Sequence, residues 1–186
     1  MKLSIPIHRV LLAAIVAAVA VSTVAQLAYA GPQAPTVPDT IAVEDGNKLF
    51  LVAHAVGVQV YPCLATSSGY AWGPSTPQAD LYDDNGKLIG THFGGPSWQL
   101  KDGSKVLAQR KDGVTVDPTA IPWLLLTAKS PTAGPDGDRL VGTTLIQRIS
   151  TTGGLAPPAA DCNAATVETT ERVPYTADYL FWKKTA

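Results

Sequence analysis

The sequence predicts an all-β fold, either an antiparallel β-sandwich or a partly closed barrel, with long Gly/Pro-rich loops and one disulfide. Runs rich in Val, Ile, Thr and aromatic residues recur along the 186-residue chain, as is typical of strands. Turn residues separate these runs roughly every 8–12 residues, the spacing expected of sandwiches and barrels. Helix signals are weak, and we expect only one short helical turn, over 159–165.

The segment 1–30 is predicted to be a secretory signal peptide. Lys2 and Arg9 precede an almost wholly apolar run, and Ala28-Tyr29-Ala30 forms the small-x-small pattern of a cleavage site. Cleavage there would place the protein in the periplasm or outside the cell and would leave no stable membrane span. The alternative is an uncleaved membrane anchor, because a bilayer needs about 20 apolar residues.

The rest of the chain is predicted to contain an arm and one domain. Three prolines at every third position favour an extended Pro-rich arm over 31–47. Residues 48–186 then form a single β-rich domain, which matches the usual size of one domain.

The clearest strand runs over 49–61. Both of its faces are mostly apolar, so we expect a central strand covered on both sides, with His54 as a core histidine that has its hydrogen bonds satisfied. Asn85-Gly86 predicts a hairpin over 84–87 in which both residues take a positive φ. Further turns are expected at 101–104 and 111–113. The other predicted strands are 79–83, 88–93, 105–109, 114–116, 121–127, 140–149 and 173–182.

The two cysteines, Cys63 and Cys162, are predicted to form a disulfide, since an even cysteine count in an exported chain is typical of a structural bridge. A redox pair or a thiolate metal site is the alternative, but the chain has no Cys-x-x-Cys motif. No metal site and no cofactor are expected, because the histidines lack metal-ligand spacing and no glycine-rich nucleotide motif occurs.

Composition and charge exclude further classes. The chain is 46% hydrophobic and 16% charged, which is too apolar for a disordered protein. Its net charge is −1, and its only adjacent basic residues are Arg110-Lys111 and Lys183-Lys184. Nucleic acid is therefore not an expected partner, because phosphate binding needs a continuous basic surface.

Several short blocks occur in an order that resembles a known family. They are Gly57-Val58-Gln59-Val60-Tyr61-Pro62-Cys63, Gly90-Thr91-His92-Phe93-Gly94-Gly95-Pro96-Ser97-Trp98, Asp102-Gly103-Ser104, Ile121-Pro122-Trp123-Leu124-Leu125-Leu126, Gln147-Arg148, Thr152-Gly153-Gly154-Leu155-Ala156-Pro157, Cys162 and Val173-Pro174-Tyr175-Thr176-Ala177-Asp178-Tyr179. Together they resemble the exported Domain of Unknown Function 3455 family over most of 49–182. The resemblance implies secretion, and it supplies no catalytic residue because no activity is established for the family. Gln99 departs from the acidic residue expected after Trp98.

The densest group of polar and aromatic residues is the candidate ligand-binding site: Trp72, His92, Trp98, Asp102 and Ser104. If His92 and Trp98 face one cleft, they supply an aromatic wall and a titratable group for a small ligand. The alternative is purely structural: His92 bonds a loop carbonyl, and Trp98 fills one end of the core. His92, Asp102 and Ser104 are also the residue types of a hydrolytic triad, although Asp-Gly-Ser is equally an ordinary turn.

Three functions follow as hypotheses. The first is that the protein is not an enzyme but a secreted module that binds a small molecule or a glycan. The second is a hydrolase that uses His92 with Asp102 or Ser104. The third is a structural or interaction protein of the cell envelope, for which we expect a filled interior without a cavity.

Overall fold

The computed structural model describes residues 32–185, and the predicted signal peptide lies outside them. Nearly all of the regular structure is strand, so the predicted all-β class is confirmed. The elements are η1 (Asp39–Ile41), β1 (Asn47–Thr66), β2 (Gly69–Trp72), β3 (Thr76–Tyr82), β4 (Leu88–Phe93), β5 (Ser97–Leu100), β6 (Lys105–Val114), β7 (Trp123–Thr132), β8 (Thr143–Gly153), η2 (Ala159–Asp161) and β9 (Thr170–Lys184).

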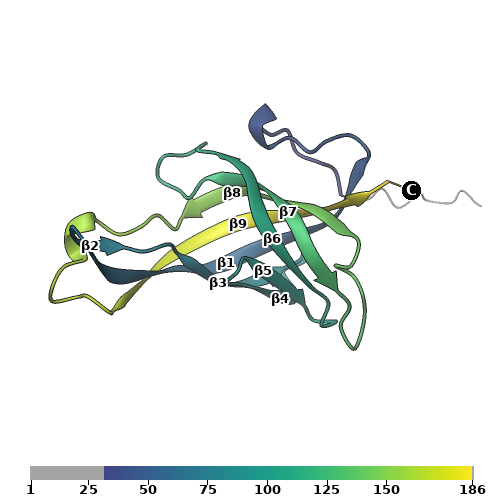
Figure 1. Ribbon diagram of the computed structural model, residues 1–186. Coiled ribbons are helices and arrows are strands. Elements are labelled where there is room, and N and C mark those ends of the chain that lie inside the picture. The colour runs from purple at the N-terminus through teal and green to yellow at the C-terminus, as the bar shows by residue number, and fades with distance from the viewer. Residues whose placement is uncertain (1–31, 186) are drawn as a thin grey trace, which may run out of the picture.

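The strands form one antiparallel sheet that closes partly into a ring, which decides between the two predicted architectures in favour of the barrel. The nine strands follow the order β2-β1-β3-β4-β5-β6-β7-β8-β9, and β9 also pairs with β1. That second pairing is long and runs from Asn47 opposite Lys184 to Pro62 opposite Thr170. Beyond the barrel, β1 and β9 continue together and carry β2 as a short hairpin (Figure 1).

Alternation along the strands separates an inner face from an outer face. On β1 the residues Leu51, Ala53 and Ala55 are buried and belong to the main core inside the barrel. Gly57 continues this inner face opposite Ala79 of β3. A Cβ at Gly57 would lie 2.2 Å from the Gln78 carbonyl oxygen, so only glycine permits this approach of β1 to β3.

A second, smaller core lies on the outer face of the barrel. It unites residues of β7, β8 and β9 with Ile41 of η1, and Val37 also packs against it. Ile41 is fully buried, and its carbonyl oxygen accepts a hydrogen bond of 2.7 Å from Gln147 Nε2. The segment before β1 therefore packs on the barrel, which the Pro-rich sequence did not predict.

The predicted disulfide is confirmed. Cys63 near the far end of β1 is bonded to Cys162, just after η2, across a sequence separation of 99 residues. Such a bond is typical of a chain that resides in an oxidising compartment. Within 32–185, none of the helices has the length and apolar character needed to cross a bilayer.

Two expectations for the first strand need correction. The strand is central, because β1 pairs with both β3 and β9, but its outer face is only partly covered. Val56 is 56% exposed, and His54 lies between Asp178 at 2.7 Å and Asp84 at 2.9 Å rather than in the core. The hydrogen bond with Asp84 is the main cause that raises the pKa of His54, and Asp178 adds to it, while partial burial opposes both.

The predicted hairpin at 84–87 joins β3 to β4, but only Gly86 takes a positive φ, of 72°. The predicted turn at 111–113 and the strand at 114–116 are wrong. Residues 111–113 lie inside β6, which absorbs them through a register shift between Arg110 and Asp112. The short strands β2 and β5 were missed, because four-residue runs carry too little pattern.

Candidate functional site

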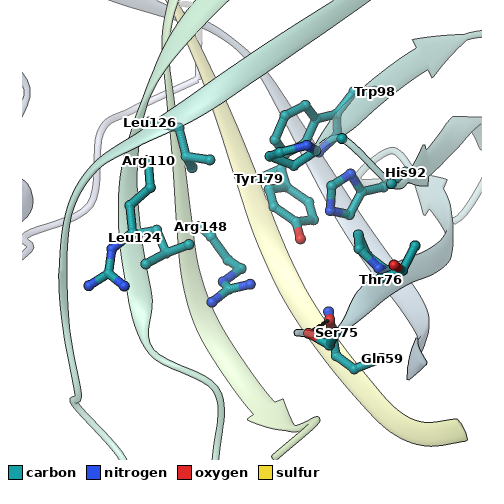
Figure 2. A pocket seen from close by; sticks show the side chains of 14 residues that line it. Gln59, Ser75, Thr76, His92, Trp98, Arg110, Leu124, Leu126, Arg148 and Tyr179 are labelled. Carbon is teal, nitrogen blue, oxygen red and sulfur yellow. Dashed lines mark hydrogen bonds between the residues drawn. The ribbon is translucent and has the colours of Figure 1, made fainter. Parts of the chain in front are cut away.

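A pocket of about 240 Å³ opens at the end of the barrel from which β1 and β9 extend. Strands β1 and β3–β9 and the connections before β3 and after β4 contribute its lining (Figure 2). The lining residues are Gln59, Ser75, Thr76, Pro77, His92, Gly94, Gly95, Pro96, Trp98, Arg110, Leu124, Leu126, Arg148 and Tyr179. A barrel of eight strands has an interior wide enough to be filled by side chains or to hold one small ligand.

One wall of the pocket is aromatic. The rings of His92 and Trp98 are stacked, with centroids 4.3 Å apart and an interplanar angle of 12°. Tyr179 packs against both rings, with centroid distances of 4.7 Å to His92 and 5.2 Å to Trp98. All three side chains belong to the buried interior, so their packing fixes the wall in place.

His92 is neutral in this setting. Its Nδ1 lies 2.8 Å from the carbonyl oxygen of Ser97, which can only accept, so Nδ1 carries the proton and Nε2 keeps a lone pair. Burial, opposed by the hydrogen bond with the Ser97 carbonyl and assisted by the nearby Arg148, lowers the pKa of His92 to about 3. The ring is therefore a fixed donor toward the loop and an acceptor at Nε2.

Two buried donors of the pocket have no acceptor. Gln59 and Trp98 are only 2% and 1% exposed, and Gln59 Nε2 and Trp98 Nε1 find no hydrogen-bond partner. The Gln59 oxygen is occupied, because Oε1 accepts a hydrogen bond of 2.7 Å from the Ser75 hydroxyl. Within 32–185, no other buried side-chain nitrogen or oxygen lacks a partner, and the two residues that carry these atoms both line this pocket.

The charged groups of the pocket are both arginines. Arg148 donates through Nε and Nη2 to the Pro122 carbonyl oxygen, at 3.0 and 2.8 Å. Arg110 is exposed, and in the described part of the chain neither arginine forms an ion pair. The lining contains no Asp or Glu. Burial raises the pKa of Tyr179, although Arg148 opposes it, so the phenol stays protonated.

Of the five predicted site residues, the structure brings only His92 and Trp98 together in this pocket. Asp102 and Ser104 lie in the β5–β6 turn, whereas the pocket is bordered by the β4–β5 connection. Consecutive connections of an antiparallel sheet lie at opposite ends of the shared strand, so these two residues are at the other end of the barrel. Trp72 lies on β2, where its Nε1 donates to the Pro158 carbonyl oxygen at 3.1 Å.

The predicted triad residues do not form a hydrogen-bonded triad. The Ser104 hydroxyl donates to Asp102 Oδ1 at 2.6 Å, and the Ser104 amide donates to the same oxygen at 2.9 Å, which is the ordinary turn. His92 hydrogen-bonds Ser97 instead. Burial alone would raise the pKa of Asp102, but the hydrogen bonds from Ser104 and Arg139 together lower it.

Six polar residues of the pocket were not predicted from the sequence: Gln59, Ser75, Thr76, Arg110, Arg148 and Tyr179. Gln59 gave a usable signal, because it shares the inward face of β1 with Leu51, Ala53 and Ala55. A polar residue on an apolar inward face needs a partner or a function. The sequence signal for Arg148 was weaker: this charged residue lies on the same face of β8 as the buried Ile146.

No group of three or more metal-ligating side chains occurs within the described ranges of the chain. No curated protein and no solved structure matches the sequence. Over residues 44–183 the chain matches the family described as protein of unknown function, DUF3455, as the ordered blocks of the sequence suggested. This match spans most of the barrel, and the chain therefore belongs to the DUF3455 family.

Proposed function

We propose that this protein is a binding module that takes up a small molecule in the pocket at the end of its barrel. The observation that carries the proposal is the pair of buried donors, Gln59 Nε2 and Trp98 Nε1, which have no acceptor and belong to two residues that line one cavity. A buried donor without an acceptor costs about 1–3 kcal/mol, and a ligand that supplies an acceptor recovers this energy.

The remaining geometry supports binding rather than catalysis. The pocket combines a rigid aromatic wall with a few polar groups, which is the usual composition of small-molecule sites. Its one candidate base, His92, has its Nδ1 committed to Ser97 and a pKa of about 3, far below the range that suits a general base at neutral pH. The cavity also disfavours a purely structural role, for which we expected a filled interior.

The proposal is tested by following the indole N–H signals of the four tryptophans by NMR during titration with benzoate, benzamide, indole, cyclohexanol and methyl β-glucoside. We expect at least one compound to move the Trp98 signal and leave Trp182, which lies in the outer core, unchanged. Trp98→Phe identifies the signal. If no compound of this panel moves Trp98, the proposed function is wrong.

We also propose that the protein acts outside the cytoplasm. The Cys63–Cys162 disulfide supports this location, as does the apolar leader that ends in Ala28-Tyr29-Ala30. Expression of the full chain in a Gram-negative bacterium, followed by fractionation and mass spectrometry, should give a periplasmic or released protein that begins at Gly31. Retention of the uncleaved chain in the membrane fraction would contradict the proposal.

A further inference from the structure

Most of the side-chain nitrogens that line the pocket are hydrogen-bond donors. Gln59 Nε2 and Trp98 Nε1 are unpartnered donors, and the Gln59 oxygen is already used by Ser75. Arg110 and Arg148 add guanidinium groups, which can only donate. Nε2 of neutral His92 is a free acceptor, and the hydroxyl groups of Ser75, Thr76 and Tyr179 can accept as well as donate. The groups that can only donate still outnumber the one that can only accept, which favours a ligand rich in acceptors.

The pocket is also positive. Its two arginines have no carboxylate within ion-pair distance in residues 32–185, and none of its lining residues is acidic. His92 is held neutral by burial, and Tyr179 keeps its proton, so neither offsets this charge with a negative one. Figure 2 shows Arg148 beside Tyr179, on the far side of the cavity from His92 and Thr76.

The shape of the pocket limits the ligand further. Its volume of about 240 Å³ lies below the roughly 300–1,000 Å³ of pockets for drug-sized molecules. Leu124 and Leu126 of β7 face the aromatic wall, so the middle of the cavity is apolar between the donors. This arrangement suits a small molecule with a flat, apolar body and one acceptor-rich end.

We propose, on the basis of the binding function above, that the ligand is a small organic carboxylate of aromatic or similarly flat shape. Its carboxylate meets Arg148, with Arg110 at the rim, and its ring lies between Trp98 and Tyr179 on one side and Leu124 and Leu126 on the other. A carboxylate offers only acceptors and pairs well with guanidinium. A neutral sugar brings as many donors as acceptors and leaves the arginines without a counter-charge.

Benzoate and benzamide test this inference, because they have nearly the same shape and differ in charge and in one acceptor. Isothermal titration calorimetry at fixed ionic strength should give a Kd for benzoate at least about tenfold lower than for benzamide, as expected for a charge-assisted hydrogen bond. Inorganic phosphate and methyl β-glucoside should bind more weakly than benzoate.

Arg148→Gln should remove the preference for benzoate and leave the affinity for benzamide nearly unchanged. The matched control is Arg139→Gln, which removes one positive charge near the β5–β6 turn at the other end of the barrel and should leave both affinities within about twofold. Far-UV circular dichroism and thermal melting establish that each variant is folded. If Arg148→Gln does not fold, the exposed Arg110→Gln takes its place, with a smaller expected loss of benzoate affinity.

The outcomes separate this inference from the proposed function. If benzamide or the glucoside binds as tightly as benzoate and moves the Trp98 signal, the carboxylate inference is wrong and the binding function stands. If phosphate binds as tightly as benzoate, the inference that the ligand has a flat organic body is wrong. If an Arg148 variant that folds keeps the benzoate preference, the assigned charge contact is wrong. If nothing in either panel binds, both proposals fail.

Discussion

Two regions of the barrel each contain a buried tryptophan and a buried glutamine. They differ in whether the polar atoms of these side chains have hydrogen-bond partners. In the outer core, Trp182 Nε1 donates to Gln147 Oε1 at 2.9 Å, and Gln147 Nε2 donates to the Ile41 carbonyl oxygen at 2.7 Å. In the pocket, Trp98 Nε1 and Gln59 Nε2 have no acceptor.

The difference separates a structural region from a candidate binding region. The outer core is completed by the chain's own N-terminal segment, which supplies Ile41 as both an apolar side chain and a backbone acceptor. No segment of the described chain supplies acceptors to Trp98 and Gln59. Because proteins satisfy nearly all buried polar groups, this unsatisfied pair is the observation on which the proposed binding function rests.

The largest expected effect comes from replacing the two glutamines. Gln147→Leu leaves Trp182 Nε1 and the Ile41 carbonyl without partners, so the free energy of unfolding should fall by about 1–3 kcal/mol for each group. Gln59→Leu removes an unpartnered donor and a single hydrogen bond with Ser75, and should change stability much less. Urea unfolding of both variants measures the difference, and equal losses would contradict the comparison.

Ile41→Ala tests how strongly the N-terminal segment holds the outer core. Ile41 is fully buried there, and truncating a buried isoleucine typically lowers the free energy of unfolding by about 2–5 kcal/mol. The matched control is Val37→Ala, at a half-buried position of the same segment, for which we expect a smaller loss. A negligible change for Ile41→Ala in urea unfolding would show that the segment does not stabilise the barrel.

The two tryptophans give a third test. Trp182→Phe and Trp98→Phe remove similar volumes, but only the first leaves a buried acceptor, Gln147 Oε1, without its donor. Trp182→Phe should therefore be more destabilising by about 1–3 kcal/mol in urea unfolding. For ligand affinity we expect the opposite ranking of the two substitutions. Trp98→Phe should weaken binding, and Trp182→Phe should leave it unchanged.

The smallest effect concerns pH. The folded pKa of His92, about 3, lies below its ordinary value of 6.5, so folding favours the neutral ring. Its contribution to stability is complete above about pH 6.5 and is lost as the pH falls toward 3, by at most about 1.4 kcal/mol per pH unit. Between pH 7 and about 5, the free energy of unfolding of the unmodified protein should therefore fall as the pH falls. In His92→Phe this part of the pH dependence should be absent.

His54 provides the internal contrast for that experiment. Its pKa is raised by Asp84 and Asp178, so its stabilisation is complete below about pH 6.5 and is lost as the pH rises through the folded pKa. In an NMR titration, His54 should titrate above its ordinary range, and His92 should stay neutral throughout mildly acidic solution. A His92 signal that titrates near pH 6.5 would overturn its assignment as a buried neutral ring.

Much of the fold could be predicted from local sequence patterns. The strand at 88–93 was predicted with the bounds that the structure gives to β4, and the pairing of Cys63 with Cys162 followed from the cysteine count. Strand periodicity and turn residues are short-range properties, so they can be read from neighbouring positions. The bulge in β6 was not predictable in this way, because a partner strand determines whether Lys111-Asp112-Gly113 turns or continues.

The site depended on contacts that are distant in the sequence. His92 and Trp98 were predicted together and lie together, because the tight β4–β5 connection places them opposite each other. Asp102 and Ser104 are almost as near in sequence, but one more strand reversal carries them to the other end of the barrel. Gln59 and Arg148 enter the pocket from β1 and β8, far apart in the chain.

The amino-acid order alone thus established an exported, disulfide-linked β-domain as the expectation and identified the aromatic pair His92 and Trp98. Closure of the sheet, through the pairing of β9 with β1, determined the rest. Closure turns inward-facing residues of strands remote in the sequence toward a common interior, and there Arg148, Gln59 and Tyr179 meet the aromatic pair. The physical reason is that a strand's alternation fixes which residues share a face, whereas long-range hydrogen bonding fixes which faces enclose a common space.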